Sequence, residues 1–311
     1  MTLVSCIVTT CHRPHLVGHA VESVLAQTHR ELELIVVVDG PDEATERVLG
    51  TCRDPRLRVV VQPTRAGQGR ALNTGIALAR GEIVALLDDD DTWRPTKLAR
   101  QLEAAASSGV RFPIVGCRFV ARREGGEVVW PTRRPRPGEP VAEYLFCRHQ
   151  WRFGEGIVPT SVHLAPTALF RAVPLNEARK SHCDLDWLIR ADQFDGASVV
   201  FPRDEAPLAT WEMQSHRPRM SNAHDWRYSL AWIDARRALV GPRAYAGFVL
   251  TWVSHSARAE GDGRAFAVLL DAALRHGRPN AMELIVHAGI WALPTGLRAF
   301  ASGGSTAEPT P

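Results

Sequence analysis

The sequence lacks several features that would assign it to a specialised class of protein. Lys and Arg number 37 and Asp and Glu number 34, so the formal net charge of +3 gives no excess of one sign for binding nucleic acid. No uninterrupted apolar run reaches the roughly 18 residues that a membrane-spanning helix needs. The first residues read as a strand, without the basic segment of a signal peptide. We therefore expect a globular, cytoplasmic protein.

The cysteines show no framework for disulfides or structural zinc. There are six, none in a Cys-x-x-Cys pair, at Cys6, Cys11, Cys52, Cys117, Cys147 and Cys183. This scatter favours free thiols in a reducing compartment. Hydrophobic residues make up 45% and charged residues 23% of the chain, which is enough apolar material for a sizeable core.

Strand and helix patterns alternate over the first hundred residues. We expect strands at 4–9, 32–38, 57–61 and 83–87, and helices at 16–27, 43–49, 70–79 and 95–106. This alternation predicts an α/β fold with a mostly parallel sheet covered by helices on both faces. Asp91 and Thr92 are both candidates for the N-cap of the fourth helix.

The rest of the chain is less regular at first and then helical. Strands are expected at 112–119, 127–130, 198–201 and 208–213, a strand leading into a helix at 162–170, and a short helix at 184–191. Four helices are expected at 226–239, 244–258, 265–276 and 281–292. The small, polar tail at 302–311 is typical of disorder.

Four consecutive aspartates, Asp88 to Asp91, follow the fourth expected strand. Adjacent carboxylates repel one another, and a divalent cation such as Mg²⁺ or Mn²⁺ relieves that repulsion. A solvated acidic turn is the alternative. Asp39 follows the second strand, so it lies at the same sheet edge, where ligands of parallel α/β sheets bind.

Three segments together resemble family 2 glycosyltransferases with the GT-A fold. They are GEIVALLDDDDTWRPTKL at 81–98, RAGQGRALNTG at 65–75, and the opening 4–10 followed by Arg13-Pro14 and SVLAQT at 23–28. The resemblance runs in order over about residues 1–220, which makes it more specific than any single motif. It implies a Rossmann-like, inverting, metal-dependent enzyme that uses a nucleotide-diphosphate sugar.

The resemblance also implies roles on the donor side. Asp90 and Asp88 would be the metal ligands, and Asp89 and Asp91 would support them or contact the sugar and ribose. Asp39 would contact the base or ribose, although Asp39-Gly40-Pro41 is also an ordinary turn sequence. Val38 stands where the family often has a second acid. The remaining nucleotide-side residues would be Thr9, Arg13, Arg70 and Asn73.

On the acceptor side, the segment 182–190 resembles the acidic motif that opens a helix in these enzymes. Asp184 would be the base that takes the proton of the acceptor hydroxyl, with Asp186 as the second candidate. The alternative for Asp184 is a helix N-cap. The segment 211–221 resembles the family's late loop, in which His216, Arg217 and Arg219 would contact the diphosphate; an ordinary solvated basic loop is the alternative.

Other clusters allow two interpretations. Arg133, Arg134 and Arg136 lie among prolines, where they could face an anionic lipid or simply solvent. His149, Trp151 and Phe153 could line an acceptor groove or belong to the core. The helices after 225 could lie on a membrane surface, cover the catalytic domain or form a dimer contact.

The sequence therefore predicts a GT-A domain at 1–224, with a nucleotide-binding half at 1–110 and an acceptor-side half at 111–224. A helical extension at 225–300 and a disordered tail at 301–311 would follow. The expected reaction moves a sugar to a glycan or lipid-linked acceptor in surface polysaccharide or cell-wall synthesis. The alternatives are a non-catalytic binding domain of the same fold and a sugar-phosphate nucleotidyltransferase; the latter is disfavoured because no glycine-rich loop follows the first strand.

Overall fold

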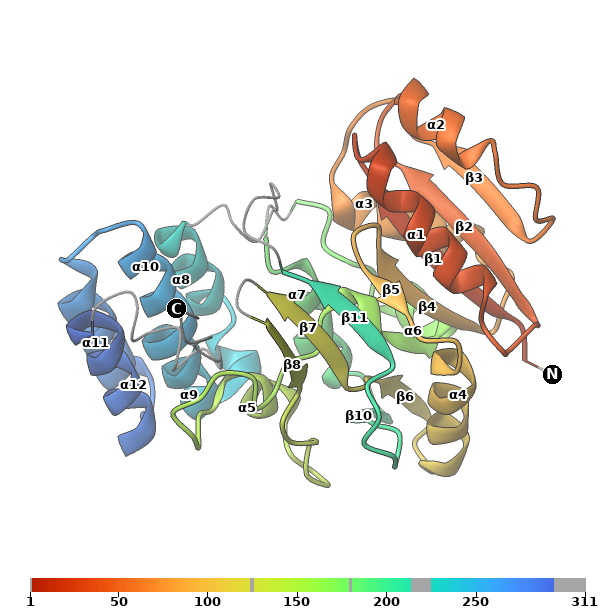
Figure 1. Cartoon of the computed structure of the whole chain (residues 1–311). Coiled ribbons are helices and arrows are strands. Elements are labelled where there is room, and N and C mark those ends of the chain that lie inside the picture. Colours follow the sequence, from red (N-terminus) through yellow and green to blue (C-terminus); the bar gives the residue numbers. More distant parts are fainter. Residues whose placement is uncertain (1, 124–125, 179–180, 214–224, 294–311) are drawn as a thin grey trace, which may run out of the picture. The chain divides into compact units, whose positions relative to one another are not determined.

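The computed structural model describes residues 2–123, 126–178, 181–213 and 225–293 (Figure 1). The chain forms two compact units, one of residues 1–122 and 158–213 and the other of residues 123–157 and 214–311. Each is described by itself. The two units do not follow the predicted boundary at residue 224, because the segment 123–157 groups with the helices.

The first unit is built on a seven-stranded sheet with the order β10-β6-β9-β4-β1-β2-β3. Parallel pairing joins β1 to β2 and β4, β2 to β3, and β6 to β10, whereas β9 runs antiparallel to β4 and β6. The mostly parallel sheet is therefore confirmed. The strands are β1 (Val4–Thr10), β2 (Leu32–Val38), β3 (Leu57–Val61), β4 (Ile83–Asp88), β6 (Phe112–Val115), β9 (Leu164–Pro166) and β10 (Ala197–Val200).

Every residue of β1 and β2 is buried, as expected for strands that are covered on both faces. The helices of this unit include α1 and α3, which both contact β1 and β2. They are α1 (Pro14–Leu25), α2 (Glu43–Leu49), α3 (Gln68–Leu78), α4 (Lys97–Ser107), α6 (Thr167–Ala172), α7 (Cys183–Asp192) and a 3₁₀ turn at Thr160–Val162.

A smaller sheet in the same unit joins β5 (Thr92–Trp93), β11 (Ala209–Glu212) and β7 (Phe119–Arg123). The predicted strand 112–119 is thus two strands, β6 and β7. Gly116 lies between them, where a side chain would meet the ring of Phe201 at 2.8 Å. The predicted N-cap of α4 was also wrong: Thr96 occupies that position, whereas Thr92 belongs to β5.

The second unit contains β8 (Gly126–Trp130) and the helices α5 (Val141–Phe146), α8 (Trp226–Asp234), α9 (Arg237–Gly247), α10 (Ser254–Ala259), α11 (Ala265–His276) and α12 (Ala281–Ala292), with a π-helical turn at Phe248–Val253. The ring of Phe248 lies 4.8 Å from that of Phe146 and 5.1 Å from that of Trp232, so these aromatic side chains form its core.

The helices after residue 225 largely follow the sequence pattern. The predicted bounds of α11 and α12 are confirmed. The predicted helix 226–239 is instead divided between α8 and α9, and α9 itself is interrupted at Gly241, whose φ is 71°, immediately before Pro242.

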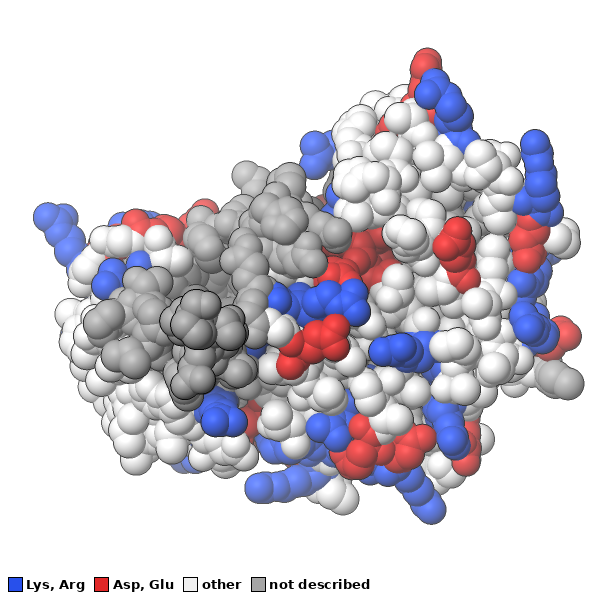
Figure 2. All heavy atoms as spheres, in the orientation of Figure 1, with Lys and Arg blue, Asp and Glu red and all other residues white. Residues whose placement is uncertain are grey.

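The surface charge, the helix lengths and the state of the cysteines agree with what the composition predicts. Basic and acidic side chains are interspersed over the face shown in Figure 2, without one large patch of a single sign. No helix among the described residues has the length and apolar character needed to cross a membrane. All six cysteines are free.

Candidate active site

The site lies at the carboxyl ends of three neighbouring strands. Parallel register places Thr9 of β1 beside Asp88 of β4, and Thr10 of β1 beside Val38 of β2. Asp39 follows Val38 directly, so the two acidic segments predicted to share this edge of the sheet are brought together there. Side chains from the loop before α3, from the start of α1 and from the 3₁₀ turn complete the site.

Asp39 fixes the loop that leads into α3. Its two carboxylate oxygens accept hydrogen bonds from the backbone N–H of Ala66 at 2.7 Å and of Gly67 at 2.9 Å. Gly67 has φ 92°, which favours glycine at the position before the helix. The Asp39 carboxylate therefore holds a backbone turn in this structure, and its contact with base or ribose stays a prediction.

Asp88 is the last residue of β4. Its Oδ1 accepts a hydrogen bond of 2.6 Å from the side-chain amide of Gln68, at the first turn of α3. Burial, and then the negative charges of Asp90, Asp89 and Asp184, raise the pKa of Asp88 to about 8. Burial is thus the larger cause of this raised pKa, and the neighbouring carboxylates add to it.

Arg13, at the start of α1, pairs with the next two aspartates. Its guanidinium lies 2.7 Å from Oδ1 of Asp89 and 3.3 Å from Oδ2 of Asp90. Asp89 is buried, and burial outweighs the attraction of Arg13, so the pKa of Asp89 rises to about 6. Arg13, predicted to contact the nucleotide, thus contacts the acidic run itself.

Asp91 is fixed by the protein on both oxygens. The hydroxyl of Ser161 donates to Oδ2 at 2.5 Å, and the backbone N–H of Glu212 donates to Oδ1 at 3.0 Å. Burial and the charges of Asp90 and Asp88 raise the pKa of Asp91 well above its usual range. Asp91 therefore connects β4 to the 3₁₀ turn and β11 and positions the acidic run.

Asp184 lies in the first turn of α7. The position before the helix is held by His182, with φ 61° and no side-chain cap, so Asp184 is not the N-cap. Its Oδ1 accepts from the N–H of Leu185 at 2.9 Å, and burial raises its pKa. A Cβ at Gly69 would lie 3.3 Å from Sγ of Cys183, so the start of α7 lies against the start of α3, where Gln68 contacts Asp88.

Asp186, the second candidate base, has a different environment. Its side chain is fully buried and pairs with Nε of Arg190 at 2.8 Å, one turn further along α7. This ion pair between successive turns stabilises α7. Its predicted substrate contact stays a prediction.

The other predicted donor-side residues differ in exposure. Thr9 is buried, and Arg70 is exposed on α3. Asn73 donates to the carbonyl of Leu175 and to Glu177 and accepts from the N–H of Leu175, so it ties α3 to the loop before α7. His216, Arg217 and Arg219 lie outside the described residues, so their predicted roles stay predictions.

Two residues of the site were missed by the sequence analysis. Gln68 stands inside the quoted segment 65–75 and could have been singled out as the first residue of α3. Ser161 carries no local signal, because its partners Asp88 and Asp91 are about seventy residues away in the chain.

The donor set fits a divalent cation that shares its ligands with a substrate. Within the described residues, no group of three or more His, Cys, Asp or Glu is arranged to hold a metal. Mg²⁺ and similar ions are commonly bound by one or two carboxylates together with substrate phosphates. Asp88 and Asp90 offer two such carboxylates, and in this structure Gln68 contacts the first and Arg13 the second.

Comparison with known proteins gives the family. The model of glycosyl transferase family 2 matches residues 5–167. The amylovoran biosynthesis glycosyltransferase AmsB of Erwinia amylovora is 28% identical over 68% of this chain and 70% of its own length. The succinoglycan biosynthesis protein ExoO of Rhizobium meliloti is 36% identical over 36% of this chain, and the match spans only 32% of its own length.

Solved structures show the same fold. TarS of S. aureus, in complex with UDP-GlcNAc, aligns over 99% of this chain and 93% of its own, with a TM-score of 0.57 and 16% identity. The mannosyltransferase PcManGT of Pyrobaculum calidifontis, in complex with GDP-Man and Mn²⁺, aligns over 96% and 82%, with a TM-score of 0.57 and 19% identity. The α/β architecture is thus that of GT-A proteins, and the chain belongs to glycosyl transferase family 2.

Proposed function

We propose that this chain transfers a sugar from a nucleotide-diphosphate donor to a glycan or lipid-linked acceptor, with inversion at the anomeric carbon. The observation that carries the proposal is the meeting of Asp88, Asp90 and Asp184 at the carboxyl edge of the sheet. Burial and, after it, the negative charges of Asp90, Asp89 and Asp184 raise the pKa of Asp88, which is a cost that binding a cation would reduce.

Asp88 and Asp90 are the residues that would hold Mg²⁺ or Mn²⁺. When bound there, such an ion supplies Lewis-acid stabilisation of the negative charge on the leaving nucleoside diphosphate. The protein fixes the ligands in advance: Gln68 orients Asp88 at 2.6 Å, and Arg13 orients Asp90 at 3.3 Å. Asp91 keeps the turn in place through Ser161 and Glu212.

Asp184 is our candidate for the base. An inverting displacement needs a carboxylate that removes the proton of the acceptor hydroxyl as its oxygen attacks the anomeric carbon. Burial raises the pKa of Asp184, which strengthens it as a base, and the hydrogen bond from Leu185 orients its carboxylate at the start of α7. Asp39, Thr9 and Arg70 would contact the nucleoside side of the donor.

The substrate class is proposed from the names of relatives. ExoO and AmsB are proteins of succinoglycan and amylovoran biosynthesis. WfaP of Escherichia coli, 30% identical over 36% of this chain and 45% of its own length, is named as a glucosyltransferase acting on α-D-GlcNAc-diphosphoundecaprenol. We infer that this chain acts in surface polysaccharide synthesis, on an acceptor of this glycan or lipid-linked kind.

A nucleotide-release assay tests the proposal. UDP-, GDP- and dTDP-sugars would each be incubated with the protein in Mn²⁺, in Mg²⁺ and in EDTA. We expect slow hydrolysis of one donor that requires the metal and is lost in Asp90→Asn. A donor that binds without metal and is never cleaved, even with acceptor extracts present, would favour a binding domain instead.

We further propose that the helical unit contacts a membrane surface peripherally. Large apolar side chains are exposed on α11 and α12, namely Val268, Leu274, Leu284 and Ile285. Arg264 and Arg278 flank these helices and would attract anionic lipid. Flotation with vesicles that contain an anionic lipid tests this: Ile285→Glu should reduce binding, and equal binding of both proteins would remove the proposal.

A further inference from the structure

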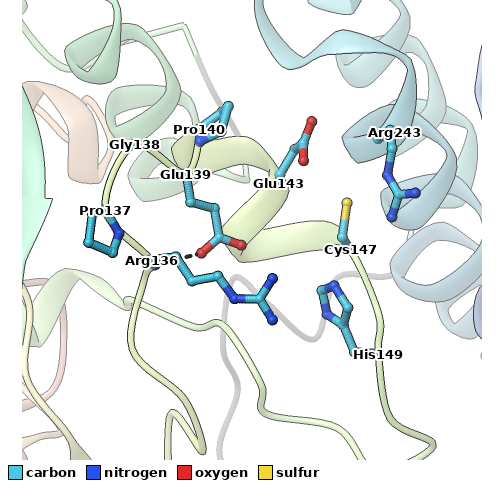
Figure 3. Close-up of a pocket in the computed structure, with 9 residues that line it drawn as sticks. All are labelled: Arg136, Pro137, Gly138, Glu139, Pro140, Glu143, Cys147, His149 and Arg243. Carbon is cyan, nitrogen blue, oxygen red and sulfur yellow. Dashed lines mark hydrogen bonds between the residues drawn. The ribbon is translucent and has the colours of Figure 1, made fainter.

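A polar cavity lies within the second unit, separate from the residues of the candidate active site. Its volume is about 460 Å³, which falls in the range of small-molecule sites, about 300–1,000 Å³. The walls come from the proline-rich loop, from α5 and the residues just after it, and from α9 (Figure 3). The lining residues are Arg136, Pro137, Gly138, Glu139, Pro140, Glu143, Cys147, His149 and Arg243.

Three basic side chains from different segments line this cavity. Arg136 belongs to the proline-rich loop, His149 follows α5, and Arg243 belongs to α9; Figure 3 shows all three around the same space. Within the described part of the chain, neither Arg136 nor Arg243 has a carboxylate partner for its guanidinium. Like charges around one cavity are unfavourable until an anion enters it.

Neighbouring arginines of the same unit are paired, which sets these two apart. Arg133 makes a forked ion pair with Glu139, with both oxygens at 2.7 Å. Arg148 lies 3.7 Å from Glu155 and donates to three backbone carbonyls. Arg133 and Arg148, which hold the loop and the chain after α5, thus each have a carboxylate partner next to the cavity.

The acidic side chains of the lining do not cancel this charge. Glu139 is neutralised by Arg133, and its Oε2 also accepts the backbone N–H of Arg136. Burial raises the pKa of the Cys147 thiol to about 12, so the thiol is neutral at physiological pH. Glu143 is the remaining acid among the lining residues, and the imidazole of His149 lies 3.4 Å from Oε1 of Glu155, so the positive charge of the cavity comes from its two guanidinium groups.

Nearby Glu283 does not serve as the missing partner. Its charge is felt by Arg243, but its two oxygens accept hydrogen bonds from the backbone N–H of Arg148 at 3.2 Å and of Asn280 at 2.9 Å. Glu283 therefore holds the start of α12 against the chain after α5, while Arg243 acts on it through its charge and also interacts with the side chain of Cys147 in the lining.

We propose that this cavity binds a phosphate or diphosphate group through Arg136, His149 and Arg243. A guanidinium donates two parallel N–H groups to a phosphate, and two guanidinium groups from opposite walls can hold one diphosphate between them. The group could come from an isoprenoid-linked diphosphate or from a free inorganic anion, because both present the same oxygens. Its residues differ from those of the donor diphosphate site of the proposed function, and the proposal does not rest on that function.

Calorimetric titration of the full chain with inorganic pyrophosphate, in EDTA, tests the proposal. EDTA removes the metal on which donor binding at Asp88 and Asp90 would depend. We expect saturable binding whose Kd rises about tenfold or more in Arg243→Gln and in Arg136→Gln, because each loses a charge-assisted hydrogen bond. Arg275→Gln, on the exposed face of α11, is the matched control and should bind as the wild type does.

Two further titrations locate the site and name the source of the anion. Asp90→Asn should bind pyrophosphate in EDTA unchanged, since it alters only the other site. Farnesyl diphosphate binding more tightly than pyrophosphate, with the same dependence on Arg243, would support an isoprenoid-linked ligand; equal affinities would support a free anion. Circular dichroism and melting curves show that each variant is folded. Equal pyrophosphate affinity in all the arginine variants, or equal loss in Arg275→Gln, would overturn the proposal.

Discussion

The hydroxyl of Ser161 donates a hydrogen bond of 2.5 Å to Oδ2 of Asp91. Oγ of Ser161 also accepts a hydrogen bond of 3.1 Å from the backbone N–H of Asp88, so one side chain fixes both ends of the acidic run. A run of four aspartates repels itself, and its geometry must therefore be imposed from outside. Ser161 on the 3₁₀ turn and Arg13 at the start of α1 are the residues that impose it.

The first prediction concerns this hydroxyl. Ser161→Ala leaves the buried Asp91 carboxyl with one donor fewer, so we expect the free energy of unfolding to fall by about 1–3 kcal/mol. The KM for the donor should rise as well, because the backbone N–H of Asp88 loses its acceptor, Oγ of Ser161. Ser107→Ala, which removes an exposed hydroxyl at the end of α4, is the control and should change neither. Urea denaturation of the three proteins measures the difference.

A second prediction concerns the start of α3. A Cβ at Gly69 would lie 2.7 Å from the carbonyl oxygen of Asn176 and 3.3 Å from Sγ of Cys183. Gly69→Ala should therefore move the helix start, carry Gln68 away from Asp88, and cost about 1–3 kcal/mol of stability. Gly18→Ala, whose Cβ would find its nearest neighbour at 4.0 Å, should be neutral or slightly stabilising. Equal melting temperatures for both variants would contradict this packing.

The third prediction follows from the pKa of Asp88, raised from 3.8 to about 8. Between these values the folded state holds a proton that the unfolded state has lost, so the free energy of unfolding falls as pH rises and levels off above about 8. Asp88→Asn lacks this dependence and should gain stability over the wild type as pH rises from 5 to 8, in EDTA.

Melting temperatures at pH 5, 6.5 and 8 measure this effect, with about 2–4 °C expected for each kcal/mol. Added Mn²⁺ should raise the melting temperature of the wild type at pH 8 but not that of Asp88→Asn. A variant less stable than the wild type throughout the range would show that the pKa of Asp88 is not raised.

The fourth prediction separates catalysis from binding at α7. Asp184→Asn should lower kcat about 10²- to 10⁴-fold, because proton removal from the acceptor is lost. Donor affinity should stay within about twofold, because we place Asp184 against the acceptor and not the donor. Asp195→Asn, on the exposed turn after α7, is the control. Unchanged transfer in Asp184→Asn would remove it as the base.

Sequence patterns predicted the parts of this fold whose causes are local. The buried runs of β1 and β2 are apolar because both faces are covered, and their bounds were close to those observed. The bounds of α12 were predicted from hydrophobic periodicity, and in the structure Asn280 and Glu283 form a capping box at its start. The sequence also predicted that Asp39 and the acidic run lie at the same edge, because the carboxyl ends of parallel strands meet at one edge of a sheet.

The remaining features depend on contacts that no local pattern encodes. The antiparallel strand β9 lies between β4 and β6, and only long-range pairing decides that place. Ser161 could not be found, because a serine in a short turn has no distinguishing neighbours in sequence. Arg13 was identified from the family resemblance, but its ion pairs with Asp89 and Asp90 required coordinates.

The most direct test of the central claim is calorimetric titration of the wild type and Asp90→Asn with UDP, GDP and dTDP, each in Mn²⁺ and in EDTA. The account predicts that one nucleotide binds the wild type tightly only in Mn²⁺, and that Asp90→Asn binds it equally weakly in both conditions. Tight binding in EDTA by both proteins, or no binding of any nucleotide by the wild type in Mn²⁺, would contradict a metal-dependent donor site at Asp88 and Asp90.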